Sequence, residues 1–247
     1  MSILSIAILL SFSVSCFSQK SAAVVDYKIF NNGDSSNTLY AKLYVENQTT
    51  LYIASYNTQV FSDAEYEAKR TRFDALKDYL KVDHKKKEIL FFEYLGQNAV
   101  LIKDEYNNLK WDITSETKTI AGYECTKATT SFRGRDWIVW FSPEIPLPYG
   151  PWKLHGLPGL ILEAEDSTNT YVWSAEKIEY RRDPVLDKDF NSFLQTRNKK
   201  PMTLKQYMDD QAEWNANLDA KMKSLTPGMG DPVYYRVGYE LKYEWEP

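Results

Sequence analysis

The segment Phe141–Asp166, FSPEIPLPYGPWKLHGLPGLILEAED, decides the fold of this chain because it leaves the backbone few conformations. It combines five prolines with three glycines and then continues as an alternating run of apolar and acidic residues. Proline fixes φ and lacks an N–H, whereas glycine reaches the left-handed region. We therefore expect a rigid corner that leads directly into a β-strand over Gly159–Glu165.

The residues before this corner predict a β-hairpin. Tyr123–Phe132 and Trp137–Ser142 are runs of strand-forming residues, and between them Gly134 can take the positive φ that a tight turn requires. The returning run is apolar on both faces, with Trp137 on one and Trp140 on the other. We therefore expect it to be a central strand that is covered on both sides.

Further runs along the chain show strand-like composition or alternation. They are Ala23–Phe30, Thr38–Glu46, Thr50–Tyr56, Glu88–Tyr94, Ala99–Glu105, Leu109–Thr114, Tyr171–Tyr180 and, near the end, Val233–Trp245. Two segments predict helices. Ser62–Leu80 begins with a capping box, and Thr203–Leu225 has a threonine cap and ends before Pro227-Gly228.

The composition indicates a sheet-rich globular protein. Aromatic residues make up 15% of the chain, and such side chains pack well across strands. Short polar connections favour antiparallel neighbours. We predict an α+β fold, mostly antiparallel β, in which a curved sheet or open half-barrel wraps around a C-terminal helix. The net charge of -4 and the lack of a basic stripe argue against a nucleic-acid partner.

The first eighteen residues predict a secretory signal peptide (residues 1–18), followed by a single β-rich domain over residues 19–247. Ile3–Leu10 is an apolar run that is too short for a membrane span, so no transmembrane segment is expected in the mature chain. Anchoring as a lipoprotein at Cys16 is a less favoured alternative, because Ser13 stands where a lipobox has leucine. The expected location is periplasmic or extracellular.

Few residues suit catalysis or metal binding. Once the signal peptide is removed, Cys125 is the only cysteine, and its position on an alternating strand favours a buried thiol. His84 and His155 are the only histidines and lie in different sequence contexts, so we expect no metal site and no cofactor. The chain has neither a nucleophile elbow nor a phosphate-binding glycine loop.

Two catalytic arrangements stay open as weaker alternatives. Cys125 and His155 would form a thiol–imidazole pair if the fold joined them. Alternatively, His155 would meet one of the carboxylates that follow the corner, at Glu163, Glu165 or Asp166, for acid–base chemistry. The favoured interpretation of these carboxylates is a solvated strand face.

A six-residue motif at the end of the corner carries a family resemblance. Gly156, Leu157, Pro158, Gly159, Leu160 and Ile161 match the signature of the GLPGLI family, which comprises secreted or envelope proteins of Bacteroidetes-type bacteria. The chain resembles that family most densely over Ile120–Asp166. The resemblance implies an exported protein whose biochemical activity is undefined.

The corner also supplies the candidate site. We expect Trp152, Lys153 and His155 to lie at the rim of a ligand or partner site, because a rigid loop lowers the entropy cost of binding. The leading hypothesis is a binding or interaction protein, not an enzyme, for an apolar small molecule or an outer-membrane partner. The alternative is a hydrolase-like enzyme with its site at the Trp152–His155 loop. A third interpretation is that the corner only secures the fold.

Overall fold

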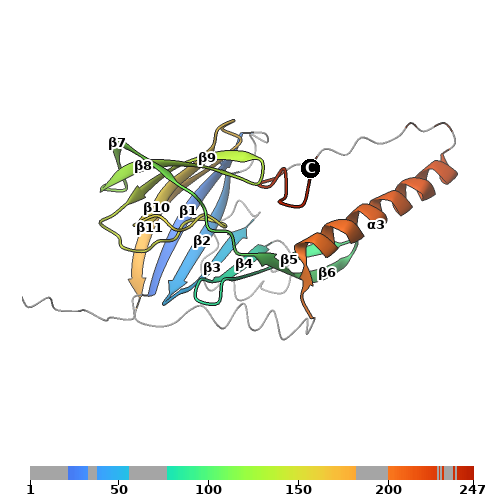
Figure 1. Ribbon diagram of the computed structural model, residues 1–247, viewed down its shortest axis with the longest axis horizontal. Helices are drawn as coiled ribbons and strands as arrows, with labels where there is room; N and C mark the ends of the chain where they lie inside the picture. The colour runs from blue at the N-terminus through green and yellow to red at the C-terminus, as the bar shows by residue number, and fades with distance from the viewer. Residues whose placement is uncertain are drawn as a thin grey trace, which may run out of the picture.

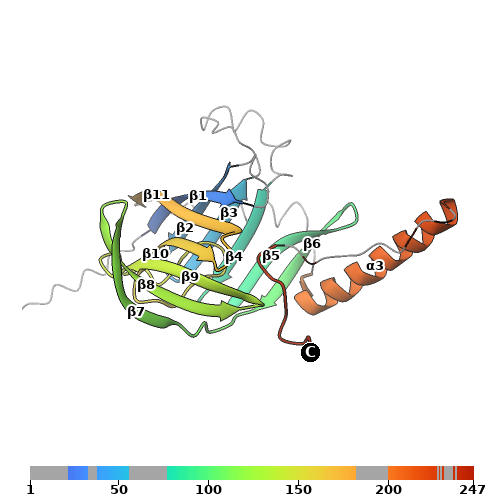
Figure 2. The same ribbon diagram turned by 90° about the horizontal axis from the view of Figure 1, so that it is seen from above.

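The computed structural model describes residues 22–32, 38–55, 77–181, 200–226, 228, 230, 236 and 238–247. Within these ranges one 12-stranded sheet carries the fold and curls into an open half-barrel (Figures 1 and 2). The elements are β1 (Ala22–Asn31), β2 (Thr38–Glu46), β3 (Thr49–Ser55), β4 (Lys77–Asp83), β5 (Glu88–Leu95), β6 (Asn98–Glu105), β7 (Asp112–Ile120), β8 (Tyr123–Phe132), β9 (Arg135–Ser142), β10 (Leu160–Asp166), β11 (Tyr171–Arg181), β12 (Met202–Thr203) and α3 (Leu204–Leu225).

The sheet is built from two antiparallel runs that are joined through its first strand. Its order is β12-β6-β5-β4-β3-β2-β1-β11-β10-β9-β8-β7. Most neighbours are consecutive in the chain, whereas β1 pairs with β11 from Ala22–Arg181 to Asn31–Tyr171. Only the short β12 runs parallel to its neighbour, β6. The prediction of an α+β, mostly antiparallel, open sheet is confirmed.

Most of the predicted elements are present, and the differences have physical reasons. The predicted helix Ser62–Leu80 lies mostly outside the described residues, but its last part is wrong: Lys77–Asp83 forms β4, in which Tyr79 and Leu80 are buried. The seventh strand begins at Asp112 rather than Leu109, because Trp111 turns away to donate its indole N–H to His155 O at 2.9 Å. The signal peptide and Cys16 lie outside the described residues.

The C-terminal segment is held by side-chain contacts and not by strand pairing. The sequence left open a strand or an ordered tail over Val233–Trp245; residues 238–247 form no strand, and positions 233–235 and 237 lie outside the described residues. The reason is that their polar groups pair with arginine and lysine side chains instead of a sheet ladder. We call residues 238–247 the strap. Its Gly238 O accepts from Arg135, and its Leu241 and Lys242 amides donate to Arg133 O in the turn between β8 and β9.

The main hydrophobic core lies on one face of the curled sheet. Trp137, Trp173 and Tyr27 are its largest fully buried side chains. The strand β9 buries Trp137, Val139 and Phe141. Its other face, with Trp140, is only partly buried, so the expectation of cover on both sides is wrong.

The proline-rich corner after β9 is locked by close backbone contacts. A Cβ atom at Gly159 would lie 2.1 Å from Ser142 O, so only glycine fits there. The amide of Ile161 donates to Tyr149 O at 2.9 Å, and the Tyr27 hydroxyl donates to Ile161 O at 2.6 Å. The corner is therefore tied both to itself and to the first strand, and it holds the residues that follow Tyr149 in fixed positions.

The helix α3 starts with the predicted capping box. The Thr203 hydroxyl accepts from the Gln206 amide, while the Gln206 side chain accepts from the Thr203 amide. The helix does not lie inside the sheet as expected: it projects from the β6 edge, and only Leu204 and Tyr207 are buried (Figures 1 and 2). Among the described helices, none is long and apolar enough to cross a membrane.

Candidate functional site

A groove of about 350 Å³ opens on the core face of the sheet. Aromatic rings form much of its wall, including those of Phe91, Trp152, Tyr171, Tyr239 and Tyr243. Its charged lining residues are Asp78, Glu93, Glu240 and Lys153. The corner supplies Trp152 and Lys153, β4 and β5 supply the first two carboxylates, and the strap supplies Glu240. Residues far apart in sequence therefore share one cleft.

Two carboxylates, Asp78 and Glu93, line the groove and interact electrostatically. The antiparallel pairing of β4 with β5 ends at Leu80 and Phe91, and Asp78 and Glu93 each lie two residues beyond that pair on their strands. Glu93 and Asp78 are both exposed to solvent by surface area, although many protein atoms surround the Glu93 carboxyl group. This desolvation, together with the negative charge of Asp78, raises the pKa of Glu93 to about 7. A carboxyl group with such a pKa can donate or accept a proton near neutral pH.

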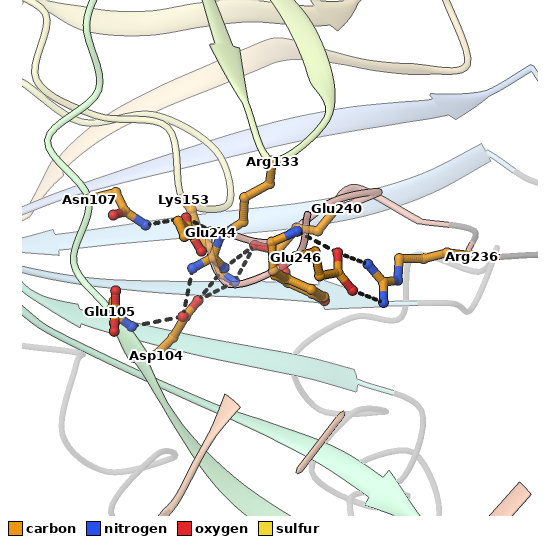
Figure 3. Close-up of polar contacts among 10 residues, drawn as sticks. Asp104, Glu105, Asn107, Arg133, Lys153, Arg236, Glu240, Glu244 and Glu246 are labelled. Atoms are coloured by element: carbon orange, nitrogen blue, oxygen red, sulfur yellow. Dashed lines mark hydrogen bonds and ion pairs between the residues drawn. The ribbon is translucent and has the colours of Figure 1, made fainter. Parts of the chain in front are cut away.

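A buried ion cluster lies beside the groove (Figure 3). The Asp104 carboxylate accepts from Arg133 Nη1 and Nη2 at 2.7 and 2.8 Å and from Lys153 Nζ at 2.7 Å. Both Arg133 and Lys153 also donate to Glu240 Oε1, at 2.5 and 2.7 Å. The side chains of Asp104 and Arg133 are each only 1% exposed. Strong mutual pairing is what permits such burial of charge.

The cluster also fixes the protonation state of its central carboxylate. Burial alone would raise the pKa of Asp104. The hydrogen bond from Arg133 and the positive charges of Lys153 and Arg133 outweigh that effect, so the pKa of Asp104 lies below its ordinary value. Asp104 is thus a carboxylate at neutral pH, and the cluster has a positioning role for Lys153 and the strap.

The strap closes one side of the groove with aromatic contacts. The ring of Tyr239 lies 5.4 Å from Trp152 and 4.9 Å from Trp173, measured between ring centroids. Arg135 donates to Gly238 O at 2.9 and 2.7 Å. The Arg133 side chain adds a hydrogen bond to Glu244 at 2.9 Å. The strap is therefore held at several points and is part of the wall.

The predicted site residues separate into two places. Trp152 and Lys153 line the groove, and Trp152 adopts a positive φ of 55° that turns the corner at this point. His155 instead lies in a second aromatic cluster. Its ring is 5.3 Å from that of His84 and 4.6 Å from that of Tyr106, between centroids. The role of the three residues as a binding rim stays a prediction.

The second cluster brings together His84 and His155, which lie in different sequence contexts. His84 is hydrogen-bonded through Nδ1 to the Tyr106 hydroxyl at 2.9 Å and through Nε2 to Thr50 Oγ1 at 3.2 Å. His155 Nδ1 donates to Lys153 O at 2.8 Å. Burial, reinforced by His155, lowers the pKa of His84 to about 4. Within the described ranges, no group of three or more His, Cys, Asp or Glu side chains could hold a metal ion.

The two weaker catalytic alternatives find no support in the contacts of His155. Cys125 is buried, its thiol faces Tyr123 O, and burial raises its pKa to about 11, so it is a poor nucleophile. Glu163 pairs with Lys118, and Asp166 accepts from Arg135 at 2.8 Å. Among the residues that the structure describes, no polar contact joins His155 to Cys125 or to these carboxylates.

Sequence reasoning missed the carboxylates of the groove. Asp78 lay at the end of a segment that had the pattern of a helix, and Glu93 stood in an ordinary strand. Glu240 and Asp104 reach Lys153 across sequence separations of 87 and 49 residues. The available signal was the spacing of Asp78, Leu80 and Val82. Side chains two positions apart lie on the same face of a strand, so the three residues share one face.

Comparison with known proteins gives the family of this chain. The model of the family described as "N-glycanase peptide, N-terminal domain" matches residues 34–205. Because this match covers more than half of the chain, the protein belongs to that family. No curated protein matches the chain.

Solved structures agree with the fold. The structures of PNGF-II in the C2 and P21 space groups are 21% and 20% identical to the chain, each with a TM-score of 0.56. Each match covers 78% of this chain but only 33% and 34% of PNGF-II, so the chain spans about a third of those proteins. A LolA superfamily protein from Nitrosomonas europaea reaches a TM-score of only 0.30 at 8% identity, which supports no argument.

These comparisons correct three expectations. The assignment to the GLPGLI family is wrong, because the family that matches is the N-glycanase domain. The leading hypothesis of a binding protein for an apolar ligand or an outer-membrane partner is wrong for the same reason, as is the expectation that the chain is not an enzyme. The hydrolase-like alternative agrees better with the family.

Proposed function

We propose that this chain acts in the hydrolytic release of N-linked glycans from glycoproteins and that the groove holds the carbohydrate. The observation that carries the proposal is the groove itself, in a domain of the N-glycanase family. Its aromatic walls and its carboxylates suit a sugar. Flat rings offer apolar faces to the C–H surface of a pyranose, and carboxylates accept hydrogen bonds from hydroxyl groups.

The size and rigidity of the groove support this proposal. A volume of about 350 Å³ lies at the small end of ligand pockets and suits one or two sugar rings. Trp152 is fixed by contacts with Trp137 and Phe132 at 5.6 and 5.7 Å between centroids. A ring that is already immobile loses little entropy when it binds a ligand.

The carboxylate pair gives the groove a group suited to hydrolysis. Release of a glycan by hydrolysis requires a proton for the leaving group and a base for the attacking water. Glu93, whose pKa is raised to about 7, is protonated in part of the molecules at neutral pH, and the neighbouring Asp78 is the second carboxylate. We assign proton transfer to Glu93 within this proposal.

The proposal is tested with the purified chain and a glycoprotein that carries one uncharged high-mannose N-glycan. Mass spectrometry measures the glycan released, and isothermal calorimetry measures binding of the free glycan. We expect binding that is lost in Trp152→Ala, and release that is lost in Glu93→Gln while binding is kept. Glu116→Gln is the matched control, because its side chain is 58% exposed and lies on the distant β7. Absence of both binding and release would overturn the proposal.

A further inference from the structure

One side of α3 carries a line of apolar residues along the whole helix. Their spacings of three, four or seven positions place them on one face, because an α-helix has 3.6 residues per turn. The members of the line are Leu204, Tyr207, Trp214, Leu218, Met222 and Leu225. We call the last four of these residues the α3 stripe.

The sheet covers the beginning of this line. Leu204 and Tyr207 are buried, and the Tyr207 hydroxyl donates to Tyr94 O at 3.2 Å. Trp214 reaches the turn between β5 and β6, where a Cβ atom on Gly96 would lie 3.2 Å from the indole nitrogen. From there the helix extends away from the β6 edge of the sheet (Figure 2).

The α3 stripe is open to solvent. Trp214 is 45% exposed, Leu218 and Met222 are each 40% exposed, and Leu225 is 68% exposed. Large apolar side chains that gather in one exposed patch mark an interaction surface. A helix also takes most of its stability from packing an amphipathic face, so a partner on the stripe would stabilise the part of α3 that extends beyond the sheet.

The order of charges along α3 indicates which partner fits. Asp209, Asp210 and Glu213 lie in the first half of the helix, whereas Lys221 and Lys223 lie near its end. Two copies of α3 that pack antiparallel bring the acidic half of each helix beside the basic end of the other. A parallel pair would place like charges side by side, so the charges favour the antiparallel arrangement.

A lipid surface fits this helix less well than a second copy does. Helices that lie on membranes are rich in lysine and arginine on their polar face. In α3 the four acidic residues, Asp209, Asp210, Glu213 and Asp219, outnumber the three lysines. The polar face therefore lacks the excess of positive charge that draws a helix to anionic lipids.

The length of the apolar line sets the register of such a pair. Two antiparallel helices that overlap from Tyr207 to Leu225 share about 28 Å of helix, with Ala216 at the midpoint. Trp214 of one copy then faces Leu218 of the other, because these positions are equally far from the midpoint. Residues 210 and 221 are six and five positions from it and lie on the same flank of the stripe, so the opposite charges at these positions meet across the pair.

We propose that two copies of this chain associate through the α3 stripe as an antiparallel helix pair. Such a contact is self-complementary and closes as a two-fold dimer. An interface of one helix pair lies at the small end of the size range, so the dissociation constant should be on the order of 10 μM. The stripe residues are not among those that line the groove, so association leaves the groove open.

Sedimentation velocity of the purified chain from about 1 to 200 μM measures the association. Leu218→Glu puts a charge at the centre of the stripe in both copies. Loss of each buried leucine weakens affinity about tenfold, so the dissociation constant should rise about a hundredfold. Ala220→Glu is the matched control: it adds the same charge at an exposed position on the opposite face of α3 and should leave the affinity within about twofold.

A charge exchange tests the orientation of the two helices. Asp210→Lys and Lys221→Asp should each weaken the dimer several-fold at low salt, because each brings like charges together. The double variant should regain the wild-type affinity. A double variant that is as weak as the single ones overturns the antiparallel register.

The remaining outcomes separate the second copy from other occupants of the stripe. A chain that stays monomeric at about 200 μM overturns the proposal, as does a dimer that Leu218→Glu and Ala220→Glu weaken equally. Thermal unfolding of the monomer at about 1 μM should give the same Tm for both variants. A Tm lower by more than about 5 °C in Leu218→Glu would mean that the stripe packs within its own chain, and co-sedimentation of the monomer with phosphatidylcholine vesicles would mean a lipid surface; either result overturns the proposal.

Discussion

Replacing Asp104 with asparagine removes the central charge of the ion cluster with almost no change in shape. The native carboxylate accepts four hydrogen bonds, two from Arg133, one from Lys153 and one from the Glu105 amide at 2.8 Å. The asparagine retains one oxygen, and its amide hydrogens would face the two cations. Arg133 and Lys153 would then share Glu240 and the more exposed Glu244.

Breaking a buried charge pair by removing one partner costs about 3–5 kcal/mol. The free energy of unfolding of Asp104→Asn should fall by about that amount. For a chain of this size each kcal/mol lowers Tm by about 2–4 °C, so we expect a decrease of about 10 °C. The measurement is urea unfolding followed by tryptophan fluorescence, together with differential scanning calorimetry, both at pH 7.

Asp26→Asn is the matched control for this experiment. Asp26 pairs with Lys42 at 2.8 Å, but the two side chains are 33% and 53% exposed. Such surface pairs contribute about 0–1 kcal/mol. If the two variants lost the same stability, burial of the ion cluster would add nothing to the stability of the protein. The cluster would then not hold the strap as described.

Further variants test the corner, the groove and the strap. Gly159→Ala should destabilise the fold by several kcal/mol in urea unfolding, because the new Cβ would lie 2.1 Å from Ser142 O; unchanged stability would refute the close approach. Glu93 has a raised pKa of about 7 in the folded state, so the folded protein binds more protons than the unfolded chain between about pH 4.5 and 7. Its contribution to stability is therefore lost as pH rises through that window, and Glu93→Gln should show a smaller fall in Tm between pH 5 and 8. Glu246 has the opposite sign: the hydrogen bond from Arg236 lowers its pKa to about 2, so its contribution is present above about pH 4.5 and lost as pH falls toward 2. Glu246→Gln should lose less stability than the wild type over that acidic range, and identical acid unfolding curves would contradict the pairing.

Local patterns in the sequence predict much of the sheet. The hairpin of β8 and β9 follows from two strand-forming runs around Gly134, which takes a φ of 80° in the turn. The start of α3 follows from Thr203 and Gln206, which are close neighbours in sequence. Both features depend on residues a few positions apart, and therefore a single sequence contains the required information.

The groove depends on contacts that a single sequence does not encode locally. Arg133 reaches Glu240 across 107 positions, and Tyr239 packs on Trp173 through the curl of the whole sheet. The segment before β4 has the charge pattern of a helix, which hid the position of Asp78 opposite Glu93. No local pattern indicates which strands will become neighbours, so these carboxylates could not be assigned to one site.

The six-residue motif was a poor guide to the family for a physical reason. Its glycine and apolar residues are required by close packing at the corner. Gly159 lies against the Ser142 backbone, and Leu157, Leu160 and Ile161 are buried. A tight corner between two strands imposes the same residue types whatever the protein does. The match over residues 34–205 uses far more of the chain and is therefore the better indicator.

The most direct measurement is a crystal structure of the chain grown with an uncharged high-mannose N-glycan. We expect a sugar ring against Trp152 in the groove, with hydroxyl groups donating to Asp78 and Glu93 and with the ion cluster unchanged. A glycan bound elsewhere on the molecule, with the groove free of sugar, would contradict the assignment of the groove as the carbohydrate site.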